Sequence, residues 1–262
     1  MNMDYFKAEK TRDNLVNWIR DWFDKNGPGC RAVIGISGGK DSTIAAGLTA
    51  RAIGKERVLG VLMPNGVQKD IGDSIAVCNS LGIKYIIVNI NDGYRGIAGE
   101  VRGSIKEKIG IESLSDQTLV NLAPRLRMAT LYAVSQTVKG RVVNTSNLSE
   151  FTAGYFTRWG DECGDFKPFI NLTKSEVVAI GLTMPEIPRY LVEKTPADGL
   201  SDKTDEDRLG FTYDDLDKWI RARNINTVSE DTVAKIRAKW DGVKFKLKAP
   251  DAFPVPEIDN EK

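Results

Sequence analysis

Residues 33–47, VIGISGGKDSTIAAG, decide the fold of this chain and raise the question of its function. The apolar start is typical of a buried strand, and residues 41–54 have the pattern of a helix that ends at a glycine. A hydroxyl, two glycines and a lysine lie between them. Such a turn leaves backbone amides bare at a helix N-terminus, which suits an anion such as phosphate. The stretch therefore predicts a phosphate-binding turn at one edge of a sheet.

The chain around this turn repeats the alternation of short apolar runs and helical patterns. Strands are predicted at residues 31–37, 57–64, 84–90 and 141–146, and helices at 5–23, 41–54, 70–82 and 115–140. Short, all-apolar strands that alternate with helices indicate a parallel sheet covered on both faces. The expected fold class is α/β: doubly wound, with a mostly parallel sheet and helices on both faces.

The pattern weakens after about residue 151. Helices are expected near residues 174–182, 214–222 and 229–240. Residues 195–210 are expected to form a mobile loop, able to act as a lid with Gly199 as a hinge, although a plain surface loop fits equally well. The proline-rich end at 250–262 is expected to fray. Without an internal repeat or a clear boundary, residues 1–262 are expected to form one domain.

Composition excludes several classes of function. The net charge of +1 argues against a pull toward nucleic acid or membranes, and no apolar run approaches a membrane span or a signal peptide. The chain has no histidine, which excludes a Ser-His-Asp triad and a histidine-ligated metal. Cys30, Cys78 and Cys163 are few, odd in number and widely spaced, which favours a reducing, cytoplasmic compartment. The chemistry must therefore rest on carboxylates, amines, guanidinium groups, hydroxyls, backbone amides and a hard metal ion.

The residue types in the turn distinguish between the known phosphate-binding motifs. The common ATPase loop would need glycine at Ile34 and Ser or Thr at Asp41, and the dinucleotide fingerprint fails at Ser37. The observed S-G-G-K-D-S resembles the loop of the N-type ATP pyrophosphatases, which implies transfer of AMP from ATP. Asp41 beside a triphosphate is a candidate Mg²⁺ ligand, although stabilisation of the helix dipole, worth about 0.5 kcal/mol, also fits an aspartate there.

Two further stretches carry charged residues in informative positions. In residues 121–132, Arg125 and Arg127 are two apart on a predicted helix, so one should face solvent and the other could reach a ligand. Pro124 is tolerable if Asn121 caps that helix. Residues 142–168 form a polar, glycine-rich stretch after a buried strand, which is typical of a binding loop and supplies acidic groups for a metal and a base.

These motifs, taken in order, resemble the ammonia-dependent NAD synthetase family. They are GISGGKDS (35–42), DSIAVCNSLG (73–82), NLAPRLRMATLY (121–132), NTSNLSE (144–150), GYFTRWGD (154–161), KTPADGL (194–200), TDEDRLGFTYDDLD (204–217) and the K-x-x-x-P of residues 246–250. Single motifs occur in other enzymes with this loop, whereas the ordered set is specific and covers most of the chain.

The resemblance implies an adenine nucleotide alpha hydrolase-like fold and a set of site residues. ATP would be bound by Gly35, Ser37, Gly38, Gly39, Lys40, Asp41, Ser42, Thr145 and Lys174, and Mg²⁺ by Asp41 and Glu150. Deamido-NAD would be bound by Arg125, Arg158, Asp165 and Lys246. Ser37, Lys174 and Asp161 would be catalytic, with Asp161 near the incoming ammonia, although a turn aspartate fits position 161 equally well.

The resemblance also implies substrates and partners. ATP, deamido-NAD and ammonia would be the substrates, and the chain leaves no length for a glutaminase domain, so ammonia would come free or from another protein. A homodimer is implied, with deamido-NAD near its interface, to which Trp18, Ile19 and Trp22 could contribute an apolar face.

The sequence departs from the family pattern at four positions and leaves two other functions open. Arg158 replaces a frequent lysine, Ala197 a hydroxyl residue, Phe245 a common histidine and Pro124 a small or polar residue. One alternative is another enzyme with this loop that adenylates a different carboxylate or a tRNA, although the near-neutral charge argues against tRNA. The other is a nucleotide sensor without turnover.

Overall fold

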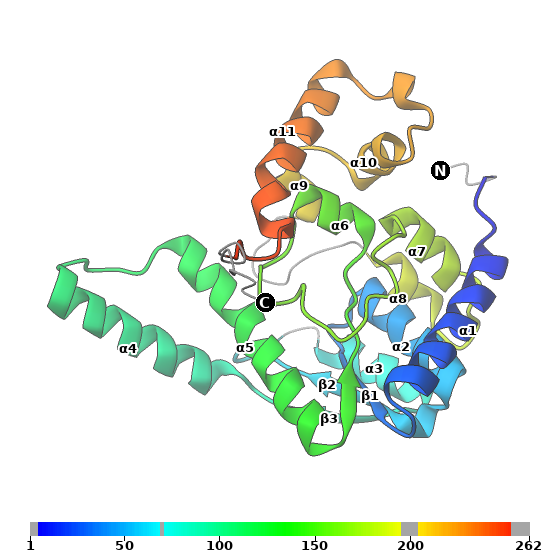
Figure 1. Cartoon of the computed structure of the whole chain (residues 1–262), viewed down its shortest axis with the longest axis horizontal. Coiled ribbons are helices and arrows are strands. Elements are labelled where there is room, and N and C mark those ends of the chain that lie inside the picture. The colour runs from blue at the N-terminus through cyan, green and yellow to red at the C-terminus, as the bar shows by residue number, and fades with distance from the viewer. Residues whose placement is uncertain (1–4, 69–70, 195–203, 253–262) are drawn as a thin grey trace, which may run out of the picture.

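A four-stranded parallel sheet lies at the centre of the structure, a computed structural model that describes residues 5–68, 71–194 and 204–252. Its strands are β1 (Arg31–Gly35), β2 (Val58–Leu62), β3 (Lys84–Ile87) and β4 (Gly140–Val142), in the order β3-β2-β1-β4 (Figure 1). The chain moves from β1 to β2 on one side and returns to β4 on the other. This reversal places the carboxyl ends of β1 and β4 side by side, which is where doubly wound sheets bind ligands.

Helices cover both faces of the sheet, as predicted. Ala32 and Ile34 of β1 belong to the larger apolar core, which includes residues of α1 (Ala8–Asn26), α2 (Lys40–Ile53), α3 (Ile71–Leu81), α7 (Lys174–Gly181) and α8 (Arg189–Glu193). Val33, between them, faces a second core that includes residues of α5 (Asp116–Thr137). The alternation of neighbouring side chains along β1 therefore separates the two helical layers.

The second half of the chain adds short helices above the carboxyl edge of the sheet. They are α6 (Leu148–Ala153), α9 (Asp205–Leu209), α10 (Tyr213–Ile220) and α11 (Glu230–Leu247), together with the 3-10 turn Ile225–Thr227. A separate apolar cluster joins α6, α9, α10 and α11 through Ala153, Leu209, Leu216 and Ile236. The expected helices near 174–182, 214–222 and 229–240 are confirmed, and the last continues to Leu247.

The expectation of a mobile loop at 195–210 is wrong for its second part. Residues 195–203 lie outside the described residues, but Thr204 and Asp207 form a capping box that starts α9. Gly210 ends this helix in the left-handed conformation, at φ 78°. Of the expected frayed end at 250–262, residues 253–262 also lie outside the described part.

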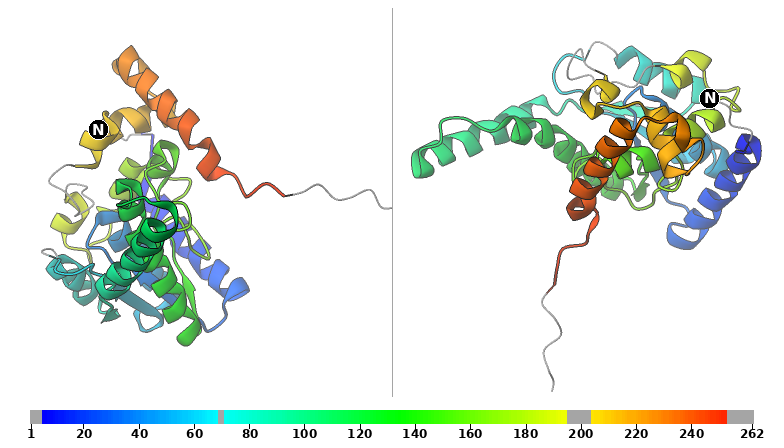
Figure 2. Two further views of the ribbon diagram at one scale, coloured as in Figure 1. Left: turned by 90° about the vertical axis from the view of Figure 1, so that its left-hand side faces the viewer. Right: turned by 90° about the horizontal axis from the view of Figure 1, so that it is seen from above.

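The sequence patterns did not reveal the helix α4 (Asn91–Ile109). With the first turns of α5 it forms an arm that projects away from the body of the molecule (Figures 1 and 2), while the rest of α5 packs against the sheet. Four glycines, at positions 93, 96, 99 and 103, interrupt its helical pattern and lower its helix propensity. None of the residues of α4 is buried, so the arm exposes its apolar side chains.

Strand β3 also differs from the expected covered strand. Its burial is low along its whole length, and Ile86 and Ile87 are 38% and 50% exposed. β3 is an edge strand, which accounts for this exposure. The sheet is therefore covered on both faces at β1 and β2 but not at this edge.

Two expectations about helix surfaces are wrong. Ile19 is fully buried, and Trp22 stacks on Phe166 with ring centroids 4.4 Å apart, so these two residues of α1 pack within the chain, whereas Trp18 is 44% exposed. Helix α5 is capped by Ser115, not by Asn121, and Pro124 lies inside it. Asn121 instead accepts a hydrogen bond from the hydroxyl of Thr157 at 2.7 Å.

None of the helices among the described residues is both long and apolar enough to cross a membrane.

Candidate active site

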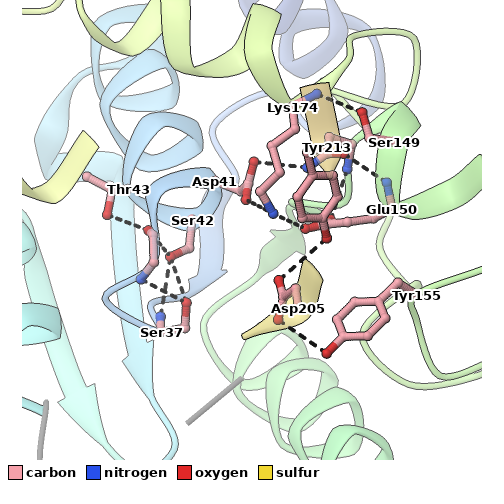
Figure 3. Close-up of polar contacts among 12 residues, drawn as sticks. Ser37, Asp41, Ser42, Thr43, Ser149, Glu150, Tyr155, Lys174, Asp205 and Tyr213 are labelled. Carbon is pink, nitrogen blue, oxygen red and sulfur yellow. Dashed lines mark hydrogen bonds and ion pairs between the residues drawn. The ribbon is translucent and has the colours of Figure 1, made fainter. Parts of the chain in front are cut away.

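The glycine turn after β1 is held by hydrogen bonds between its own residues. The Ser37 hydroxyl accepts from the amide of Gly39 at 3.2 Å and lies 3.1 Å from the hydroxyl of Ser42 (Figure 3). Gly38 has φ 78°, and a Cβ there would lie 3.1 Å from the amide nitrogen of Ser74. Both the conformation and the close approach require glycine. The turn is therefore preformed and faces solvent at Ser37, which is exposed.

The N-terminus of α2, which follows this turn, has no side-chain cap. Gly39 is its N-cap residue, with φ −82° and ψ 161°, and it offers no side chain to the first amides. Burial lowers the pKa of the next residue, Lys40, as does the nearby ammonium of Lys174, while Asp41 acts in the opposite direction. Uncapped amides, a helix dipole and a nearby lysine together favour an anion at this position. Phosphate binding by this turn stays a prediction.

Asp41 and Glu150 come together because β1 and β4 are neighbours. Asp41 lies in the first turn of α2, after β1, and Glu150 lies in the first turn of α6, after β4. The side-chain amide of Asn147 donates from Nδ2 to Asp41 Oδ1 at 3.1 Å. Lys174 Nζ lies 2.9 Å from Glu150 Oε1 and 3.6 Å from Asp41 Oδ2 (Figure 3). One ammonium therefore lies against both carboxylates.

The charges of this cluster depend strongly on one another. Burial raises the pKa of Glu150 to about 7; Asp41 adds to this rise and Lys174 opposes it. Burial alone would lower the pKa of Lys174, but Glu150 and Asp41 raise it well above its usual value. Tyr213 covers this ammonium, with its ring centroid 4.3 Å from Nζ. Lys174 is therefore a charged, nearly enclosed cation at the centre of the site.

The residues present fit a magnesium ion. No group of three or more His, Cys, Asp or Glu able to hold a metal occurs among the described residues. Mg²⁺ does not require one, since it commonly takes one or two carboxylates and completes its shell with water and substrate phosphate. Asp41 and Glu150 supply two carboxylates that already lie against one shared cation. They would hold the ion if it binds here.

Arg125 and Arg158 lie together at a second part of the predicted site. Arg125 is exposed, and its Nε lies 3.4 Å from the carbonyl of Arg158. The Arg158 guanidinium lies 4.9 Å from the ring centroids of both Trp159 and Phe245 and donates to the carbonyl of Lys248 at 2.9 Å. Two departures from the family pattern, Arg158 and Phe245, are therefore in contact. The contact is favourable because a planar guanidinium stacks well on an aromatic ring.

Arg125 and Arg127 of α5 have different surroundings: Arg127 is bonded within the chain, and Arg125 is exposed. Arg127 donates from Nε to the carbonyl of Met63 at 3.1 Å, and burial lowers its pKa. Arg127 therefore supports the chain after β2, whereas the exposed Arg125 is available to a ligand. The rule that residues two apart lie on different faces of a helix is confirmed here.

Asp161 and Lys246 both make contacts within the loop that follows α6. Asp161 Oδ1 accepts from the amide of Thr157 at 2.8 Å, the contact of a turn aspartate. Burial raises the pKa of Asp161, while the hydrogen bond from Thr157 and the positive charges of Arg127 and Lys246 act to lower it. Lys246 Nζ donates to the carbonyls of Gly154 and Phe156 at 3.0 and 3.1 Å. These contacts leave a role in binding deamido-NAD or ammonia as a prediction.

Asp165 and Thr145 belong to the segments that frame the end of β4. Asp165 Oδ2 accepts from the amide of Val142 at 2.7 Å, so its carboxylate extends the pairing at this strand. Thr145 is half-buried and follows the buried Asn144. Gly35 ends β1, and a Cβ there would lie 3.2 Å from the methyl carbon of Met63. All three positions stay predictions for substrate contact.

Three residues that shape the site, Asn147, Asp205 and Tyr213, were not predicted from the sequence. Asn147 joins Asp41 to α6, and its N-x-x-E spacing to Glu150 is the sequence signature of the capping box observed here. Asp205 accepts from the hydroxyls of Tyr155 at 3.2 Å and Tyr213 at 3.4 Å (Figure 3). Tyr213 and Asp205 stand in the quoted motif 204–217, which marked them without giving a role.

Known proteins resemble this chain over most of its length. The sequence model of the NAD synthase family matches residues 11–250. A protein of Thermococcus sibiricus named NH(3)-dependent NAD(+) synthetase is 40% identical over 247 residues, which are 93% of this chain and 91% of the relative.

Two solved structures extend this likeness to the fold. NMN synthetase from Francisella tularensis has a TM-score of 0.83 at 29% identity and covers 95% of this chain and 99% of its own. The NH3-dependent NAD synthetase from Campylobacter jejuni has a TM-score of 0.75 at 26% identity and covers 95% and 100%. The expected adenine nucleotide alpha hydrolase-like fold is confirmed, and the chain belongs to the NAD synthase family.

Proposed function

We propose that this protein makes NAD by amidating deamido-NAD with ammonia at the expense of ATP, releasing AMP and diphosphate. One observation carries the proposal: the preformed glycine turn and the Asp41–Lys174–Glu150 cluster lie at the neighbouring carboxyl ends of β1 and β4. That arrangement provides an anion site next to a candidate cation site. The relatives are named NH(3)-dependent NAD(+) synthetases. Deamido-NAD is the carboxylate that becomes NAD when ammonia amidates it, so we take it as the acceptor.

In the first step, a carboxylate oxygen of the nicotinate attacks the α-phosphorus of ATP. The bond from the α-phosphorus to the bridging oxygen breaks, and diphosphate leaves with that oxygen. The acceptor is then a mixed anhydride with AMP. The first amides of α2, which no side chain caps, and the Lys40 ammonium stabilise the charge on the departing diphosphate, which is electrostatic catalysis without a protein nucleophile.

In the second step, ammonia attacks the carbonyl carbon of the anhydride. The carbon–oxygen bond to AMP breaks, AMP leaves with that oxygen, and the nitrogen loses a proton. Asp161 binds ammonium and accepts the proton whose loss gives the attacking ammonia, and its bond from the Thr157 amide fixes one carboxylate oxygen. The second proton, lost from the nitrogen after the attack, passes to solvent water. The raised pKa of Asp161 strengthens it as a proton acceptor.

Asp41, Glu150 and Lys174 arrange the phosphates for the first step. Mg²⁺, when bound by Asp41 and Glu150, supplies positive charge to the phosphate oxygens. Lys174 keeps these two carboxylates from repelling one another and adds positive charge to this side of the site. Holding the nicotinate carboxylate in line with the α-phosphorus converts a bimolecular step into a positioned one.

Product analysis tests the proposal. Purified protein with ATP, Mg²⁺, ammonium and deamido-NAD is expected to form NAD and AMP in equal amounts, measured by ion-pair chromatography. The same reaction without ammonium is the control and should form no NAD. ADP as the nucleotide product would contradict the proposal, because it reports transfer of phosphate instead of AMP.

A second candidate substrate is the nicotinate mononucleotide. It is favoured by the TM-score of 0.83 to a protein named NMN synthetase, against 0.75 to one named NAD synthetase. Both acceptors present the same carboxylate, so the mechanism above is unchanged. The ratio of kcat/KM for the two acceptors, measured side by side, decides between them.

We also propose that two copies of the chain pair through the arm formed by α4 and α5. Its exposed apolar side chains include Ile97, Val101, Ile109, Ile111, Leu119 and Val120. With no buried residue on α4, the arm gains little from its own chain, and a second copy would bury these side chains. This surface replaces the face of Trp18, Ile19 and Trp22, of which Ile19 and Trp22 pack within the chain while Trp18 is 44% exposed.

A charge placed on the arm is expected to break the dimer. Val101→Glu should weaken self-association at least about 30-fold, because a buried glutamate would lack a partner. Analytical ultracentrifugation over a range of concentrations measures this change. Leu182→Glu, on a side chain that is 48% exposed at the end of α7, is the matched control and should leave association unchanged. A monomeric wild-type protein would contradict the proposal.

We further propose a single-domain enzyme of the cytoplasm. Its three cysteines, Cys30, Cys78 and Cys163, are all free, which suits a reducing compartment.

A further inference from the structure

Helix α10 directs a buried carboxylate, that of Asp217, at the first turn of α7. Asp217 is 2% exposed, and its Oδ2 accepts from the amide of Ser175 at 2.9 Å. Its Oδ1 accepts from the hydroxyl of Ser149 in α6. The same Ser149 oxygen accepts from the amide of Lys174 at 2.9 Å. One carboxylate therefore joins three helices through direct hydrogen bonds and one shared hydroxyl.

These bonds satisfy the amides that begin α7. The first amides of a helix have no partner within it. In α7 the amide of Lys174 bonds to Ser149, that of Ser175 to Asp217, and that of Glu176 to the Thr173 hydroxyl at 3.4 Å. Two of these three partners come from other helices. The position of the α7 N-terminus is therefore set from outside the helix.

We propose that Asp217 is a positioning residue for the reaction, since it accepts from the Ser149 hydroxyl and from the Ser175 backbone amide, and these two residues neighbour Glu150 and Lys174. Ser149 precedes Glu150 in α6, and Ser175 follows Lys174 in α7. The 2.9 Å ion pair between Glu150 and Lys174 thus spans two helices that Asp217 clamps together. The inference rests on the proposed function, in which this pair serves the phosphates of ATP.

The carboxylate form of Asp217 is what the geometry requires. Both oxygens act as acceptors, and hydrogen bonds to a charged acceptor are roughly twice as strong as neutral ones. In Asp217→Asn one acceptor becomes an NH₂ group, which cannot receive the Ser149 hydroxyl or the Ser175 amide. One buried donor would then lose its partner, and α6 and α7 would shift relative to one another.

The first test separates positioning from a general effect on the fold. Asp217→Asn is expected to weaken binding of α,β-methylene-ATP with Mg²⁺, measured by titration calorimetry, about 10- to 100-fold and to lower kcat by a similar factor. The KM for deamido-NAD should stay within about twofold. Asp214→Asn is the matched control on the same helix, because Asp214 forms a surface ion pair with Lys218 at 2.7 Å, and it should match the wild type.

A double-mutant cycle tests the route through Ser149. Ser149→Ala alone should show the same kind of loss, and Asp217→Asn with Ser149→Ala should be no worse than the more severe single variant. Additive losses, unchanged ATP binding in Asp217→Asn, or an equal rise in the KM for deamido-NAD would overturn the proposal. Circular dichroism monitors folding, and if Asp217→Asn does not fold, Ser149→Ala decides alone.

The calorimetry tests the positioning role of Asp217 independently of NAD formation. Binding of the ATP analogue is measured without any acceptor and without turnover. If the wild type makes no NAD, the proposed function fails, while weaker analogue binding in Asp217→Asn would still support the positioning role.

Discussion

Asp41→Asn should lower kcat by about 10²- to 10³-fold while the protein stays folded. Asparagine has the same shape and can still accept the bond from Asn147, which is 3.1 Å long in the wild type. What it loses is the negative charge, which we expect to be needed to hold a divalent cation against the phosphates of ATP. Steady-state NAD formation measures the effect, and circular dichroism monitors the fold.

A matched control separates this role from a simple effect on the helix dipole. Asp92 lies in the first turn of α4, as Asp41 lies in the first turn of α2. Asp92→Asn removes a similar dipole interaction, worth about 0.3–1 kcal/mol, and should leave kcat unchanged. If Asp41→Asn keeps activity within about threefold of the wild type, Asp41 acts only on its helix and the metal-ligand assignment is wrong.

Lys174→Met should remove both activity and stability. It leaves the half-buried carboxylates of Glu150 and Asp41 near one another without the buried ammonium that lies 2.9 and 3.6 Å from their oxygens. Removing one partner of a buried pair costs about 3–5 kcal/mol in the free energy of unfolding. We expect kcat to fall at least about 10²-fold, since the charge next to the phosphates is lost as well.

The stability loss in Lys174→Met should depend on pH. In the wild type the pKa of Glu150 is about 7, because burial and Asp41 raise it while Lys174 lowers it. Without Lys174 the folded-state pKa of Glu150 rises further above its unfolded value. A raised pKa favours the folded state at low pH, and this contribution is lost as pH rises through the folded-state value. The deficit of the variant relative to the wild type should therefore be larger at pH 8 than at pH 5.

Urea unfolding of the wild type and Lys174→Met at these two pH values measures the deficit. Lys218→Met is the control, because its pair with Asp214 lies at the surface and should contribute at most about 1 kcal/mol. A deficit that shrinks from pH 5 to pH 8 would contradict the account of the cluster.

The sequence predicted local features well because local patterns determine them. The β1–turn–α2 unit follows from a buried strand, two glycines and a helix start that are adjacent along the chain. The meeting of Asp41 and Glu150 does not follow from their local patterns, since it depends on β4 pairing beside β1. Only the family resemblance placed these two residues together in advance.

The features that the sequence patterns did not predict also depend on contacts between distant parts of the chain. Helix α4 was missed because its glycines weaken the helical pattern and none of its residues is buried. Trp22 was expected on an exposed face, but its stacking on Phe166 depends on a partner 144 positions away in the chain, at a centroid distance of 4.4 Å. Asp217 received no role because its hydrogen bonds join three helices. In each case the deciding contact is tertiary.

Transfer of oxygen from the acceptor to AMP tests the central claim most directly. Deamido-NAD labelled with ¹⁸O in the nicotinate carboxylate is incubated with the protein, ATP, Mg²⁺ and ammonium, and the nucleotide products are analysed by mass spectrometry. The account predicts AMP that carries one ¹⁸O for each NAD formed, because the oxygen that attacks the α-phosphorus leaves with AMP. Unlabelled AMP, or ¹⁸O in inorganic phosphate formed along with ADP, would contradict it.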